Sequence, residues 1–222
     1  MNMRCRIPGC CGGASRWGAY CNAHKIRDRR HGHPEQETIT KAILAPYVAR
    51  VRKRIDKNDT SELWGLLEQK WSDTLADCRC YLSDVVDQGV PLTKTKRGAC
   101  GELLKVAQCV APKDVVETAL AMYLLAEMEP RRFKSDRAFL FQLVRRVRGL
   151  AEVNAGEWYD HRSGRTKRVY RDLSPRTTLV MAEMLGDVFG CVGLTIARKE
   201  VEEIEGRSWM KQRTHAALEA LV

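Results

Sequence analysis

Apolar residues repeat at helical spacing over most of the chain beyond residue 38. Residues 39–57 carry an apolar residue at every third or fourth position, with cations gathered toward the end of the segment. A second stripe of the same period covers residues 63–85. Because the polar residues 58–60 separate the stripes, the pattern predicts two helices that pack together as a helical hairpin over residues 36–90.

The second half of the chain also has helical periodicity. A polar connection from Gln88 to Gly98 marks a boundary, and residues 98–222 are predicted to form a helical domain. Residues 113–128 are apolar on most sides, which predicts the buried centre of that domain. The predicted helices cover residues 102–110, 113–128, 135–150, 175–189, 196–204 and 209–221, with a break expected at Gly190 to Gly193.

One segment of the second half favours strands. Residues 157–170 alternate aromatic and basic side chains around Ser163-Gly164, a turn signal, and therefore predict a basic β-hairpin. A helix, a turn, a second helix at 135–148 and a basic hairpin follow one another in the order of a winged helix. The alternative is a helical domain that carries a solvated hairpin. Either way, the predicted fold is mainly α.

The first 35 residues, hereafter the N-terminal module, contain two pairs of metal-ligand residues. Cys5 and Cys10 flank a Pro-Gly turn, and Cys21 and His24 are spaced to share one face of a helix turn. Three thiolates and one imidazole complete a closed tetrahedron, which is typical of a structural zinc site. Cys11 is an alternative to Cys10. The module has few apolar residues, so bound zinc would supply its missing core.

The pattern around these ligands resembles a known family. Its parts are Cys5, Pro8-Gly9-Cys10, Trp17-Gly18, Tyr20-Cys21, His24, Arg29 to Gly32, and Pro34. They are similar to a small zinc-binding module at the N-termini of many phage and mobile-element proteins, some of them HNH-type endonucleases. The resemblance implies a zinc knuckle that often contacts DNA. Only His161 and His215 follow the module, without the HNH pattern, so nuclease activity is not implied.

The positive charge of the chain is segregated. The net charge is +10, with 13 basic and 5 acidic side chains in residues 1–60 and the same numbers in residues 131–176. Two arginine-rich blocks favour a nucleic acid as the partner, because guanidinium groups bind backbone phosphates, and DNA is favoured over RNA. The candidate nucleic-acid contacts are Lys25, Arg27, Arg29 and Arg30 in the first block, and Arg145, Arg146, Arg148, Arg162, Arg165, Lys167 and Arg168 in the second.

Several classes of protein do not fit the sequence. No phosphate-binding glycine loop, metalloprotease motif or nucleophile motif occurs, so an enzyme is not expected. No run approaches 18 uninterrupted apolar residues, and the first residues lack the apolar core of a signal peptide. We therefore expect a cytoplasmic protein without a membrane partner, whose nine cysteines are buried or bind metal rather than form a disulfide framework.

These expectations lead to two functional hypotheses. The first is a zinc-containing DNA-binding protein of a phage, plasmid or other mobile element, acting as a regulator. The second is a subunit or inhibitor of a larger nucleoprotein complex, such as a CRISPR-type defence or counter-defence system, with protein subunits as partners. A regulator should bind duplex DNA alone, whereas a subunit should bind weakly until its partners are present.

Overall fold

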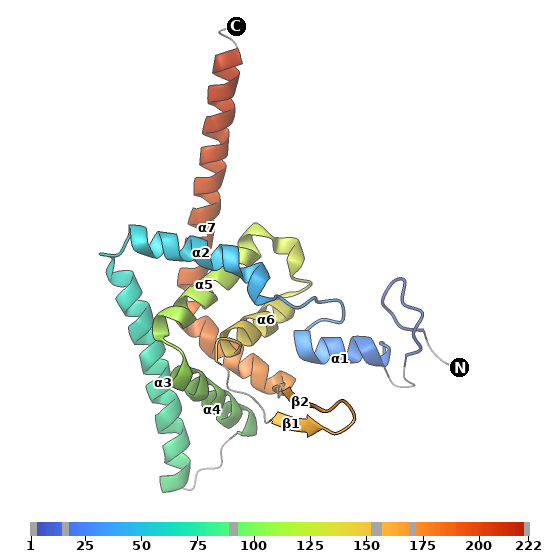
Figure 1. Ribbon diagram of the computed structural model, residues 1–222. Helices are drawn as coiled ribbons and strands as arrows, with labels where there is room; N and C mark the ends of the chain where they lie inside the picture. Colours follow the sequence, from blue (N-terminus) through green and yellow to red (C-terminus); the bar gives the residue numbers. More distant parts are fainter. Residues whose placement is uncertain (1–3, 15–17, 89–92, 152–156, 169–171, 220–222) are drawn as a thin grey trace.

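The computed structural model describes residues 4–14, 18–88, 93–151, 157–168 and 172–219, and within them the fold is mainly helical (Figure 1). The module contributes one helix, and the remaining helices and a two-stranded sheet follow in the order predicted. The elements are α1 (Asn22–His31), α2 (Lys41–Lys57), α3 (Glu62–Gln88), α4 (Lys94–Cys109), α5 (Pro112–Met128), η1 (Pro130–Arg132), α6 (Asp136–Arg148), β1 (Glu157–Asp160), β2 (Arg165–Arg168) and α7 (Pro175–Glu219).

Helix α5 forms the centre of the fold, as its sequence predicts. Pro112 occupies its first turn, and every residue from Val115 to Leu125 is buried. Helices α2, α6 and α7 pack against it, α7 most extensively. Buried side chains between residues 39 and 197 form one cluster, so the segments on either side of the predicted boundary at residues 88–98 share a core.

Helix α7 is continuous, and the break expected at Gly190 to Gly193 is wrong. A Cβ atom on Gly193 would lie 2.4 Å from Cδ2 of Tyr123, and one on Gly190 would lie 3.4 Å from the Tyr123 hydroxyl oxygen. These glycines therefore allow the Tyr123 ring on α5 to pack against the α7 backbone. The helix continues through them because its apolar face is buried on both sides of the contact, at Phe189 and Ala197.

The predicted hairpin of α2 and α3 is also wrong as a packed pair. Helix α2 packs chiefly on α5, and α3 packs on α4. The buried face of α3 turns toward the later helices: the ring centroids of Trp71 and Phe189 of α7 lie 6.0 Å apart. Apolar periodicity located both helices but could not show which partner would cover each apolar face.

Among the described residues, α7 is the one helix that is long and apolar enough to cross a membrane. The absence of an uninterrupted apolar run, from which we expected no membrane partner, therefore does not by itself exclude a membrane span. Length and composition are weak evidence, because the core helix of a protein without a membrane span passes the same test. In this fold the apolar stretch of α7 places Met181, Leu185 and Phe189 in the core, each with no exposed surface.

Candidate metal centre and nucleic-acid interface

The structure brings together the four predicted ligand residues of the module. The Sγ atoms of Cys5 and Cys21 lie 3.4 and 3.2 Å from Nδ1 of His24. The Sγ atoms of Cys10 and Cys21 lie 3.8 Å apart, and all four ligand atoms lie within 4.8 Å of one another. The four side chains are therefore close enough to hold one metal ion.

These distances match the edges of a tetrahedral site. With metal–sulfur and metal–nitrogen bonds of about 2.3 and 2.0 Å, the edges should be about 3.8 Å between sulfurs and about 3.5 Å between sulfur and nitrogen. The Cys10–Cys21 separation of 3.8 Å is far too long for a disulfide. Cys11 is exposed and lies outside the group, so Cys10 is the cysteine that joins it.

Two glycines let the chain fold around this cluster. Gly9 has φ +73°, a conformation that glycine adopts without strain, and the turn closes with a hydrogen bond from Cys10 N to Ile7 O. A Cβ atom on Gly12 would lie 2.9 Å from the Cβ of Cys21. Cys21 is the N-cap of α1 and His24 lies in its first turn, so the two side chains share one face of the helix.

Hydrogen bonds at the cluster favour a thiolate at Cys5. Burial raises its pKa, but hydrogen bonds from the backbone at Cys21 and Ile7 and from the side chain of His24 outweigh burial. The net effect lowers the pKa of Cys5 to about 6. Cys5 is thus largely ionised at neutral pH, which is the form that binds metal.

The first basic block is partly exposed on α1. Arg27 and Arg29 are exposed. Lys25 is half-buried and already interacts with another group of the protein. Arg30 is exposed but forms an ion pair with Asp172, with 2.8 Å between its Nε and a carboxylate oxygen. Of the four predicted contacts on α1, Arg27 and Arg29 are therefore the two most available to a ligand.

The predicted contacts on α6 are largely engaged within the protein. Arg145 pairs with Asp172 at 3.1 Å and Arg148 pairs with Glu102 at 2.7 Å. Arg146 is half-buried, and its Nε atom is enclosed. Helix α6 lies against α1, α4, α5 and α7, so it does not present the open polar face that a groove-reading helix needs.

The predicted β-hairpin is present, with Glu157 opposite Arg168 and Asp160 opposite Arg165. Carboxylate oxygens of Asp160 accept hydrogen bonds from Arg162 N at 3.1 Å and from the Ser163 hydroxyl at 2.8 Å, which organises the turn. Arg162 and Arg165 are exposed. The side chains of Lys167 and Arg168 lie outside the described residues.

Asp172 links the segment that follows the hairpin to α1 and α6. It follows the hairpin in sequence and binds Arg30 of α1 and Arg145 of α6 through its two carboxylate oxygens. Figure 1 shows α1 and the hairpin extending from the same side of the helical body. Sequence reasoning missed Asp172, because no local motif marks a residue whose partners come from distant helices.

Comparison of the chain with protein-family models, with curated proteins and with solved structures finds no match.

Proposed function

We propose that the protein carries one structural zinc ion in its N-terminal module and binds nucleic acid, duplex DNA in particular, through α1 and the β-hairpin. Three thiolates and an imidazole are a donor set that zinc prefers. A closed set leaves no coordination position for substrate, so the ion would fold the module rather than perform chemistry. Cys5, Cys10, Cys21 and His24 would hold it.

The shared ion pairs of Asp172 carry the nucleic-acid part of the proposal. They bring the segment that follows the hairpin against α1, so that two basic blocks distant in sequence lie on one side of the molecule. Arg27 and Arg29 on α1 and Arg162 and Arg165 on the hairpin remain exposed. We call these four arginines the module–hairpin surface, and their exposed guanidinium groups suit phosphate contacts.

Mutation of the hairpin tests this proposal. Replacing Arg162 and Arg165 by Ala should weaken binding to duplex DNA and lower the slope of log affinity against log salt by about 0.9 for each phosphate that the variant no longer binds. The matched control replaces Arg79 and Arg198, which are exposed on α3 and α7. Equal affinity and slope in the two variants would remove the hairpin from the interface.

For the role in the cell, we propose a regulator of a phage, plasmid or mobile element, on the strength of the resemblance of residues 1–35. A nucleoprotein-complex subunit is a second candidate, and the end of α7 favours it. Figure 1 shows this helix projecting well beyond the body, and Trp209 and Met210 on it are more than half exposed. Tight duplex binding by the purified chain alone would support the regulator, whereas binding that requires a co-purifying protein would support the subunit.

A further inference from the structure

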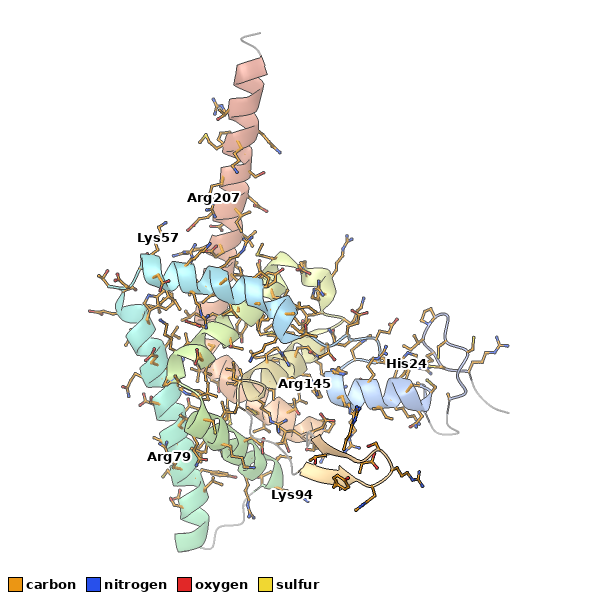
Figure 2. The ribbon with its side chains drawn as sticks, in the orientation of Figure 1. His24, Lys57, Arg79, Lys94, Arg145 and Arg207 are labelled. Carbon is orange, nitrogen blue, oxygen red and sulfur yellow. The ribbon has the colours of Figure 1, made fainter. Side chains whose placement is uncertain are left out.

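A basic groove lies where α7 leaves the helical body and passes the end of α2. It encloses about 680 Å³ and is lined by residues of these two helices and by Asn58. Figure 2 shows Lys57 of α2 and Arg207 of α7 close together at this junction. The cations of its rims are Arg50, Lys53 and Lys57 on α2 and Arg207 and Lys211 on α7.

The two carboxylates that line the groove share one cation of its floor, Arg54. Arg54 forms a hydrogen-bonded ion pair with Glu200, and its Nη2 atom lies 2.7 Å from a carboxylate oxygen of Glu203. The side chains of Arg54 and Glu200 are only 15% and 11% exposed, so this pair forms the floor of the groove. The triad that includes Glu203 fastens α2 to α7 and keeps one net negative charge, so the lining of the groove has a net charge of +4, from six cations and two carboxylates.

The rim cations are exposed, although Lys57 and Arg207 lie near enough to Glu203 to help Arg54 lower the pKa of that carboxyl. Arg50, Lys53 and Lys57 lie on one face of α2, and Arg207 and Lys211 are one turn apart on α7. Arg207 donates a hydrogen bond from Nε to the backbone carbonyl oxygen of Glu203, at 3.0 Å. Within the described part of the chain, the other four rim cations form no salt bridge: Arg50, Lys53, Lys57 and Lys211.

The layout of the rims suits a chain of phosphates. From Arg50 to Lys57 the helix rises about 10 Å, which is the axial length of about three successive phosphates in one strand. The cations line two sides of an open groove and do not converge on one point, as they would around a single phosphate. A concave groove also fits a strand better than it fits the flat surface of a bilayer.

We propose that this basic groove binds the sugar-phosphate backbone of nucleic acid, as a second contact separate from the module–hairpin surface. The inference rests on the proposed function and extends it. Figure 2 shows Lys57 and Arg207, which line the groove, at the upper end of the helical body and away from the hairpin. The protein therefore holds two segments of nucleic acid, or two parts of one bent segment.

The test uses the full-length, zinc-loaded protein and fluorescent 20-nucleotide single-stranded and 20-base-pair duplex DNA. One variant carries Lys53→Gln, Lys57→Gln and Lys211→Gln, which leaves Arg54 and its carboxylates in place. The control variant carries Lys70→Gln, Arg79→Gln and Lys113→Gln, three exposed helix positions that remove the same charge. Circular dichroism checks that both variants keep the helical content of the parent.

We expect the groove variant to bind at least tenfold more weakly than the control at low salt, with a salt slope lower by about 0.7 to 0.9 for each phosphate that it no longer binds. Bound DNA should also protect Lys53, Lys57 and Lys211 from acetylation, as read by mass spectrometry. Equal affinity, equal slope and unprotected lysines would overturn the groove proposal. Preferential binding to vesicles of anionic lipid that is abolished in the groove variant would overturn it as well.

The same titrations separate this proposal from the module–hairpin surface. Weaker DNA binding by the hairpin variant alone would support the proposed function and contradict the groove proposal. Weakening in the groove variant alone would support the groove and remove the hairpin from the interface. A parent protein that binds neither DNA probe would overturn both.

Discussion

Gln142 of α6 and His31 at the end of α1 are joined by a hydrogen bond from Nε2 of Gln142 to Nδ1 of His31, at 3.1 Å. Gln142 is fully buried, and its Oε1 atom accepts a second hydrogen bond, from Ile39 N, at 3.0 Å. Beside this contact, Gly32 lies so close to α6 that a Cβ atom would be 2.7 Å from the Arg137 carbonyl oxygen. One buried amide thus fixes the module and the start of the helical body to the same helix.

Replacing Gln142 by Leu should therefore destabilise the protein. The substitution leaves the Ile39 N–H without its side-chain acceptor, at a cost of about 1 to 3 kcal/mol in the free energy of unfolding. Urea unfolding followed by circular dichroism measures the change. A matched control is Gln69→Leu, on an exposed position of α3, which should change stability by no more than about 0.5 kcal/mol. Equal stability of the two variants would mean that the buried amide contributes nothing.

The same contact predicts a pH dependence of stability. Burial is the main cause that lowers the pKa of His31 from 6.5 to about 4, and the nearby charge of Arg145 adds to it. Below pH 6.5 the unfolded chain binds a proton that the folded chain does not, so stability present above pH 6.5 is lost as the pH falls toward 4. Allowing for solvent screening of this half-buried ring, the loss should be about 1 to 2 kcal/mol.

Comparison with His31→Asn isolates this contribution. The variant has no titrating group at position 31, so its free energy of unfolding should fall less than that of the parent between pH 6.5 and 4. Unfolding at a series of pH values measures the difference. Parallel curves for parent and variant would show that His31 titrates alike in the folded and unfolded chains.

The metal centre predicts a sharp contrast between neighbouring cysteines. Cys10→Ser removes one of four clustered ligands and should lower zinc retention at least tenfold, whereas Cys11→Ser should retain one zinc per chain. Elemental analysis after dialysis against a moderate chelator measures both. Equal retention by the two variants, or a parent protein without metal, would contradict the assignment.

Loss of the metal should have a local effect. In a Cys21→Ser, His24→Ala variant, limited proteolysis should cut within residues 1–35, while the helical body resists cleavage and keeps its circular dichroism spectrum. The reason is that the described residues of the module bury almost no apolar side chains besides two ligand cysteines, whereas the body has its own core. Collapse of the whole spectrum would show that the body depends on the ion.

The packing of α7 on α5 predicts opposite effects for two glycines of the same helix. Gly193→Ala places a methyl group 2.4 Å from Tyr123 and should destabilise the protein by about 1 to 3 kcal/mol. Gly186→Ala meets no atom within 4 Å and should stabilise the helix by up to about 1 kcal/mol. Thermal unfolding of both variants tests the contrast. A stabilising Gly193→Ala would mean that Tyr123 moves aside freely.

The sequence by itself determined the features that depend on neighbours along the chain. Ser135 precedes an apolar stripe in the position of a helix cap, and its hydroxyl accepts a hydrogen bond from Ala138 N at 3.1 Å. The apolar run of α5 predicts its burial, and Ser163-Gly164 predicts the hairpin turn, where Gly164 has φ +62°. The spacing of the four ligand residues predicts their convergence. Each of these follows from helical period, cap chemistry or turn chemistry within a few residues.

Tertiary structure decided what each surface meets. Gly190 and Gly193 have the local character of helix breakers, but the Tyr123 ring that fills the space beside them lies on another helix. From the sequence, Arg145 and Arg148 are predicted to be free to bind nucleic acid. In the structure both form ion pairs with carboxylates that are distant along the chain. The basic groove likewise requires α2 and α7 to meet. Packing partners and ion pairs between distant segments depend on the three-dimensional arrangement, which local periodicity does not encode.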